Sequence, residues 1–134
     1  MRSRAAALTV VLIAVVAGAT RGDAAPTRQW AIVYLAEPTM IGSTIVQGPV
    51  LFVHDDDRMA RGEACTTVRL FEPGKGPKEE IAEFHCTPVA RARARVFTVR
   101  TTPNEDTGLG CVLTEYQFAG DTEGHKVPTR AHLN

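Results

Sequence analysis

The chain has 134 residues, with 15 Lys and Arg side chains against 15 Asp and Glu, so its formal net charge at pH 7 is +0. This balance argues against a general electrostatic attraction to nucleic acid or to anionic lipid. The length fits one small domain with a modest hydrophobic core.

The start of the chain predicts a secretory signal peptide at residues 1–24. Two arginines precede an apolar run from Ala5 to Ala19, which is shorter than the roughly 20 residues of a membrane span. Small residues at Gly22 and Ala24 favour cleavage after Ala24. The expected mature protein is secreted, in a bacterial periplasm or outside the cell. It has no membrane span, and its 12 basic and 14 acidic side chains give a charge near −2.

The rest of the sequence predicts short strands separated by Gly, Pro, Asn and Asp, a pattern typical of all-β sandwiches and barrels. We expect one all-β domain over residues 25–120, a compact antiparallel sandwich or open barrel of six to seven short strands. A short helical turn is expected at 56–62, with Asp55 or Asp56 as its N-cap. The tail at 121–134 has no apolar periodicity and is expected to be flexible. The strand-like runs are 29–36, 43–47, 49–55, 65–72, 79–86, 93–102 and 111–119.

Three cysteines in an oxidising compartment predict one disulfide and one cysteine left over. Pairing the strand-like runs on either side of the loop 73–78 puts Cys65 opposite Cys86, within disulfide range. We therefore predict a Cys65–Cys86 disulfide and a free Cys111. That thiol is either a small core residue, which we favour, or the link in a dimer. A bridge from Cys111 to either of the others stays open as an alternative.

The stretch VHDDDRMARGEAC (53–65) contains side chains that bind metals. Histidine, thioether and thiolate are ligands that select copper, so His54, Met59 and His85, together with a cysteine, form a candidate copper site at one rim of the sheet. The spacing matches no zinc or haem motif, and a bridged cysteine pair supplies no thiolate. In the alternative interpretation Met59 fills a gap and the histidines are polar groups at strand ends.

Two charged groups are candidate binding surfaces. The first is an acidic rim next to the candidate copper site, which in the alternative interpretation is a solvated helix cap: Asp55, Asp56, Asp57 and Glu63. The second is an anion-binding or partner-binding ridge of alternating arginines: Arg91, Arg93 and Arg95. The interpretation we favour for the ridge is a charged edge strand, which discourages pairing between sheets.

Three stretches resemble a group of small, uncharacterised secreted bacterial proteins. They are LFVHDDDRMARGEACTTV (51–68), FHCTPV (84–89) and YQFAGDTEGHKVP (116–128). The resemblance covers most of the expected mature chain and implies no activity.

These features favour a secreted, non-enzymatic binding or structural module of the bacterial envelope, whose partner is an unknown protein or small ligand. The alternative is a copper-binding or redox protein that uses the His/Met/Cys cluster; apart from copper, no cofactor is expected. A hydrolase is the third hypothesis. It has the least support, because Ser43 is the single serine after residue 24 and no G-x-S-x-G motif occurs.

Overall fold

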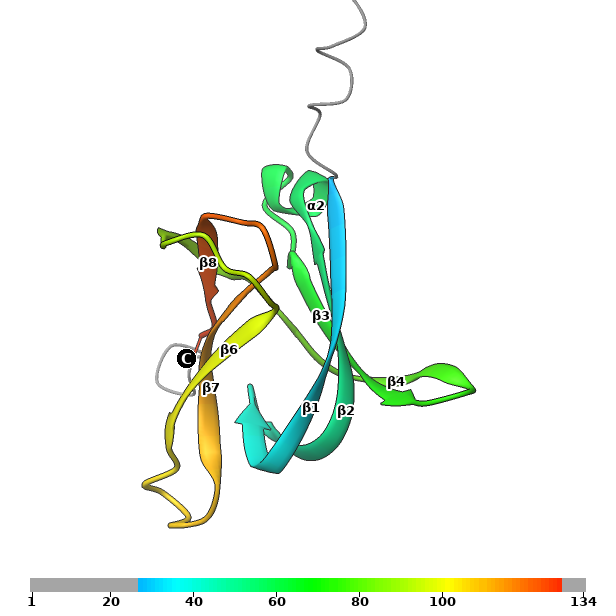
Figure 1. Cartoon of the computed structure of the whole chain (residues 1–134), viewed down its shortest axis with the longest axis vertical. Helices are drawn as coiled ribbons and strands as arrows, with labels where there is room; N and C mark the ends of the chain where they lie inside the picture. The colour runs from blue at the N-terminus through cyan, green and yellow to red at the C-terminus, as the bar shows by residue number, and fades with distance from the viewer. Residues whose placement is uncertain (1–26, 129–134) are drawn as a thin grey trace, which may run out of the picture.

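The computed structural model describes residues 27–128, which form one eight-stranded sheet and one short helix (Figure 1). The all-β class predicted from the sequence is confirmed. The predicted signal peptide at 1–24 lies outside the described residues. The elements are β1 (Arg28–Ile41), β2 (Thr44–Asp55), α2 (Asp56–Ala60), β3 (Thr66–Glu72), β4 (Gly76–Phe84), β5 (Thr87–Ala90), β6 (Thr98–Pro103), β7 (Cys111–Gln117) and β8 (Glu123–Lys126).

The sheet consists of two halves. Its strand order is β4-β3-β2-β1-β7-β8-β5, and β6 also pairs with β7. We call β1–β4 the first half and β5–β8 the second half. Every pairing is antiparallel except β1 with β7, which is parallel and, within residues 27–128, is the one ladder between the halves. The sheet is therefore open and contains one parallel pair, a departure from the fully antiparallel arrangement predicted.

The hydrophobic core lies between the two halves. On β2, Val50, Phe52 and His54 alternate along the inner face and are 0%, 0% and 1% exposed. The Phe52 ring lies 5.2 Å from the Tyr116 ring of β7, centroid to centroid. Burial of a phenylalanine in this way stabilises the fold by about 1.5–3 kcal/mol. The same alternation brings His54, the next inward residue on β2, to the end of the core.

The two halves approach closely where β7 begins. Gly110 adopts a φ of 69°, a left-handed conformation that favours glycine. A Cβ atom at this position would collide with the backbone carbonyl oxygen of Pro38 in β1. A glycine is therefore required at Gly110 on two counts, backbone conformation and space.

One predicted strand boundary and the predicted hairpin register are wrong. The runs 43–47 and 49–55 form the single strand β2, because Gly48 at a φ of 92° carries the chain through the corner without ending the pairing. The predicted hairpin register is also wrong: Thr66 faces Phe84, and both strands end before Cys65 and Cys86 are reached. The hairpin closes with Glu72 facing Gly76 instead of Glu79, and two irregularities along the ladder leave Thr66 facing Phe84 instead of His85.

The predicted helical turn is present as α2. A carboxylate oxygen of Asp55 accepts hydrogen bonds from the backbone N–H groups of Asp57 (2.9 Å) and Arg58 (3.2 Å), so Asp55 is the N-cap. Arg58 also pairs with Glu83 of β4, which attaches the helix to the sheet. The helix ends at Ala60, two residues before the predicted end.

The predictions for the tail and for the arginine ridge need correction. Residues 123–126 are the strand β8, which pairs with both β5 and β7. The three arginines precede β6 instead of lying on a strand. Arg91 forms a 2.6 Å ion pair with the buried carboxylate of Glu115, whereas Arg93 donates to the backbone carbonyl of Gly120 and Arg95 is exposed. The side chains therefore do not form one continuous ridge on an edge strand.

Candidate metal centre

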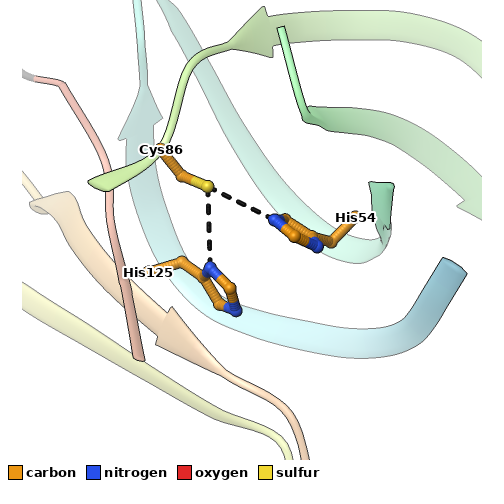
Figure 2. A group of neighbouring side chains, drawn as sticks. All are labelled: His54, Cys86 and His125. Carbon is orange, nitrogen blue, oxygen red and sulfur yellow. Dashed lines mark hydrogen bonds between the residues drawn. The ribbon is translucent and has the colours of Figure 1, made fainter. Parts of the chain in front are cut away.

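Three metal-binding side chains meet between the two halves of the sheet (Figure 2). The Sγ atom of Cys86 lies 3.4 Å from Nε2 of His54 and 3.5 Å from Nδ1 of His125. All three donor atoms lie within 4.8 Å of one another. A tetrahedral ion with metal–N bonds of about 2.05 Å and metal–S bonds of about 2.3 Å requires an N···S separation of about 3.6 Å. The spacing therefore fits a single ion.

The donors come from distant parts of the chain. His54 is the last inward residue of β2 before the N-cap of α2, and it pairs with Thr66 of β3. His125 is on β8, and Cys86 is in the link between β4 and β5. That link crosses from the first half of the sheet to the second (Figure 1). The centre therefore combines a donor from each half with one from the segment that connects them.

The His54 ring is oriented by the helix that follows it. Its Nδ1 atom lies 3.3 Å from a carboxylate oxygen of Asp56, in the first turn of α2. An N–H on Nδ1 that faces this carboxylate leaves the lone pair of Nε2 directed at Cys86. Metal-bound histidines commonly donate their other N–H to a carboxylate in this way, which fixes the ring and raises its basicity.

The His125 ring is held by packing. It pairs across the ladder with Tyr116 of β7, and the two rings stack with centroids 4.9 Å apart. The His54 ring also lies next to the His125 ring, with a centroid distance of 4.3 Å. Its Nε2 atom is buried and has no hydrogen-bond partner among residues 27–128. No hydrogen bond from residues 27–128 therefore compensates the burial of this nitrogen, whereas Nδ1 of the same ring faces the Cys86 sulfur.

The protonation states suit metal binding. Burial, together with the neighbouring His54, lowers the pKa of His125 to about 4. Burial also lowers the pKa of His54, against the opposing effect of Asp56. Both rings are therefore neutral at pH 7, the form that binds metals. Burial and the adjacent Cys65 raise the pKa of Cys86 to about 12, so this thiol keeps its proton until a cation displaces it.

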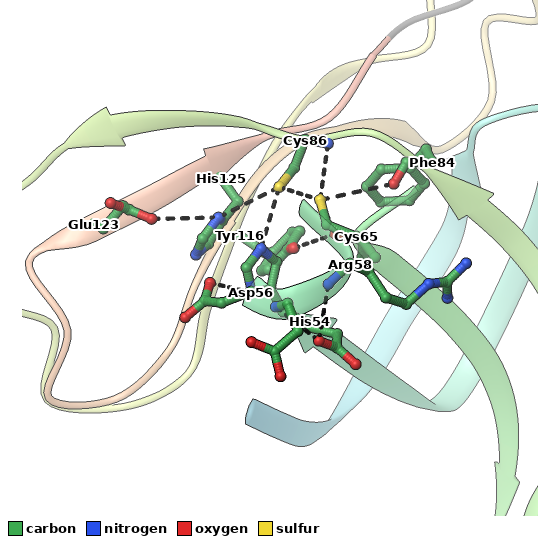
Figure 3. Close-up of polar contacts among 12 residues, drawn as sticks. His54, Asp56, Arg58, Cys65, Phe84, Cys86, Tyr116, Glu123 and His125 are labelled. Atoms are coloured by element: carbon green, nitrogen blue, oxygen red, sulfur yellow. Dashed lines mark hydrogen bonds and ion pairs between the residues drawn. The ribbon is translucent and has the colours of Figure 1, made fainter. Parts of the chain in front are cut away.

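A second sulfur lies beside the three donors (Figure 3). The Sγ atoms of Cys65 and Cys86 are 2.7 Å apart, and the backbone N–H of Cys86 donates to the Cys65 sulfur. All three cysteines of the described residues are free thiols, so the predicted disulfide is not formed in this structure. Cys111 is buried on β7, with its sulfur 3.3 Å from the Thr39 hydroxyl oxygen.

The structure brings only one of the three predicted metal ligands into the centre. Of the residues proposed from the sequence, His54 belongs to it. Met59 is half-buried on α2 and lies outside the cluster. His85 is exposed, although the next residue is Cys86 of the cluster, because neighbouring side chains of an extended chain point to opposite sides.

Most of the acidic side chains in the predicted rim contact neighbouring groups of the protein. Asp55 caps α2, and Asp56 faces His54. Glu63 forms a 2.9 Å ion pair with Arg61, and this pairing lowers the pKa of the Glu63 carboxyl. Of the four acids, Asp57 is exposed and has no such role in the described residues.

The metal site predicted from the sequence did not include His125, because this residue lies in the segment predicted as a flexible tail. The copper hypothesis did include a cysteine, but the favoured disulfide paired Cys86 with Cys65 instead. A weak signal for β8 exists, because His125 and Val127 alternate and are 1% and 5% exposed. Two alternating positions are too few to predict a strand from periodicity.

A scan against protein-family models and searches of curated proteins and of solved structures find no match to this chain. The resemblance to small secreted bacterial proteins therefore stays a prediction. No helix within residues 27–128 is both long enough and apolar enough to span a membrane.

Proposed function

We propose that this protein binds one copper or zinc ion through His54, Cys86 and His125. The observation that carries the proposal is the spacing of the three donor atoms, with N···S separations of 3.4 and 3.5 Å. Thiolate with imidazole is a donor set that suits both metals. The proposal keeps the non-enzymatic binding role expected from the sequence and makes a metal ion the ligand.

The electrostatics favour a metal ligand over a catalytic nucleophile at Cys86. A nucleophilic cysteine needs a lowered pKa, which a positive charge or a partner base provides. Burial instead raises the pKa of Cys86 to about 12. The two histidines are each 1% exposed, which leaves little access for a substrate. These features support holding an ion within the fold.

Copper and zinc make different demands on the neighbouring sulfur. A trigonal set of two histidines and one cysteine suits copper. Zinc requires a fourth donor, and the nearest sulfur is Cys65, 2.7 Å from Cys86. Two thiolates on one zinc ion lie about 3.8 Å apart at tetrahedral angles, so zinc binding requires Cys65 to move outward by about 1 Å.

The test is a competition titration of the reduced, chelator-stripped protein with Cu(I) or Zn(II), using a chromogenic chelator as competitor. We expect one ion per chain. A structural zinc ion contributes about 10–16 kcal/mol over four ligands, so loss of one ligand is expected to cost at least about 3 kcal/mol, or about 100-fold in affinity. Cys86→Ser and His125→Asn should each show this loss.

The sequence itself supplies matched controls. Met59→Leu and His85→Gln alter ligand-type side chains that lie outside the centre, and both should bind as the unmodified protein does. If the ligand variants do not fold, Asp56→Asn provides a milder change, since it alters only the carboxylate that orients His54. It should weaken binding about 10–100-fold. Equal affinities for Cys86→Ser and the unmodified protein, or a loss confined to His85→Gln, would rule out this centre.

A further inference from the structure

We propose that Cys65 and Cys86 form a redox gate on this metal centre: their oxidation to a disulfide removes Cys86 as a ligand and releases the ion. The inference rests on the proposed function, because it concerns the regulation of the same centre. The Cys65 sulfur lies beside the centre but is not one of its three donors.

The two sulfurs are positioned to react with each other. They lie 2.7 Å apart although 21 residues separate them in the chain, and a disulfide bond is 2.03–2.05 Å long. The pairing of Thr66 with Phe84, at the end of the β3–β4 ladder next to both cysteines, holds the two chain segments together. The backbone N–H of Cys86 donates to Sγ of Cys65 at 3.2 Å, which fixes that sulfur next to its partner. Only a small side-chain movement is needed to form the bond.

The Cys86 sulfur cannot serve both roles at once. Figure 3 shows it between the histidine rings and the Cys65 sulfur. As a thiolate it offers a negative charge to the ion. In a disulfide the same atom is neutral and bonded to Cys65, so the anionic ligand is lost. Metal binding and disulfide formation therefore compete for one atom.

The oxidant is a small-molecule disulfide, and the exchange balances without any other reactant. Cys86 is half-buried whereas Cys65 is fully buried, so the Cys86 sulfur is the one that the oxidant reaches first. It attacks through the small fraction of this thiol that is deprotonated, which makes the exchange slow. This step breaks the S–S bond of the oxidant and forms a mixed disulfide, and the other sulfur of the oxidant becomes a thiol. The Cys65 sulfur then attacks the Cys86 sulfur, forming the Cys65–Cys86 bond and displacing the first sulfur of the oxidant as a thiol. Two protein thiols are oxidised, one small disulfide is reduced, and both protons end on the two sulfurs of the reduced oxidant.

The remaining cysteine offers no competing route within the described fold. Cys111 is buried on β7, and its sulfur contacts the hydroxyl group of Thr39. We therefore expect one specific linkage and not a mixture of three.

The experiment treats the full chain, reduced and metal-free, with an excess of oxidised lipoic acid, a cyclic disulfide. The intact mass should fall by two hydrogens, and peptide mapping should identify the linkage as Cys65–Cys86. The competition titration should then show at least about a 100-fold loss of metal affinity, equal to the loss of one ligand, and reduction should restore it. Metal bound beforehand should slow the oxidation.

Cys65→Ser is the matched variant. It keeps the three donors and should bind copper when reduced, but it should retain that affinity after the same treatment. In this variant the mixed disulfide on Cys86 does not persist, because the free thiol of the opened lipoic acid ring attacks it, closes the ring again and restores the Cys86 thiol. Reduced protein that binds no metal would overturn the proposed function and the gate with it. If the reduced protein does bind metal, two results would overturn the redox gate alone. The first is a disulfide that involves Cys111, and the second is a Cys65–Cys86 disulfide that forms without loss of metal affinity.

Discussion

Acidification from pH 7 to pH 5 is expected to destabilise the reduced, metal-free protein, and His125 is the principal cause. Its pKa is about 4 in the folded protein against a usual value of 6.5, because burial disfavours the charged ring. Between these values the unfolded chain binds more protons than the folded one. Between pH 4 and pH 6.5 the free energy of unfolding therefore increases as the pH rises and decreases as the pH falls.

The magnitude follows from the size of this shift. At 1.36 kcal/mol per pKa unit, the complete loss is about 3 kcal/mol, reached below pH 4, and about 2 kcal/mol of it falls between pH 7 and pH 5. Burial also lowers the pKa of His54, which adds to the loss in the same direction. Glu115 titrates below this window, because Arg91 lowers the pKa of its carboxyl beneath the usual 4.5.

Urea unfolding at pH 7 and pH 5 measures the effect, with the chelator and reductant kept constant. His125→Gln should lose about 2 kcal/mol less than the unmodified protein across this interval. His85→Gln, which removes an exposed histidine from the same region, should follow the unmodified protein. If the unmodified protein and His125→Gln lose the same stability, the argument from burial of His125 is refuted.

Two further predictions concern stability away from the centre. Gly108 and Gly110 share a φ of 69°, but only at Gly110 would a Cβ strike a facing proline carbonyl. Gly108→Ala should cost about 1–2 kcal/mol in urea unfolding and Gly110→Ala clearly more; equal losses would contradict the collision. Arg91→Ala removes a partner of the buried Glu115 carboxylate, so the thermal midpoint at pH 7 should fall. Arg93→Ala, which loses only a hydrogen bond to a backbone carbonyl, should lower it less.

Local chemistry made part of this fold predictable from the sequence. Alternation of apolar residues identified most of the strands, and the aspartates after His54 identified a capped helical turn. These signals depend on neighbours within a few residues. The continuity of β2 through Gly48 was missed, because a Gly-Pro pair marks a corner in most sequences while here the ladder continues through it.

The centre was harder to predict, because long-range pairing assembles it. Ligand-type residues near His54 were visible in the sequence, but the choice between His85 and Cys86 depends on which side chain faces inward after β4. That direction follows from the register of the β3–β4 hairpin, which closes with Glu72 facing Gly76 and which the sequence pattern does not reveal. His125 enters the centre through pairing of β8 with β7, a contact between segments with no shared local signal.

The short ladder between the halves has a consequence for the kinetics of any bound ion. Within residues 27–128, hydrogen bonds of the sheet join the halves at Thr39–Cys111 and at Met40–Val112. Thr39 faces Val46, and His54 lies eight residues further along β2, a span of about 26 Å. An ion at His54 and His125 would thus clamp the end of the sheet remote from the ladder. The rate of its dissociation would then be limited by how often that end of the protein opens.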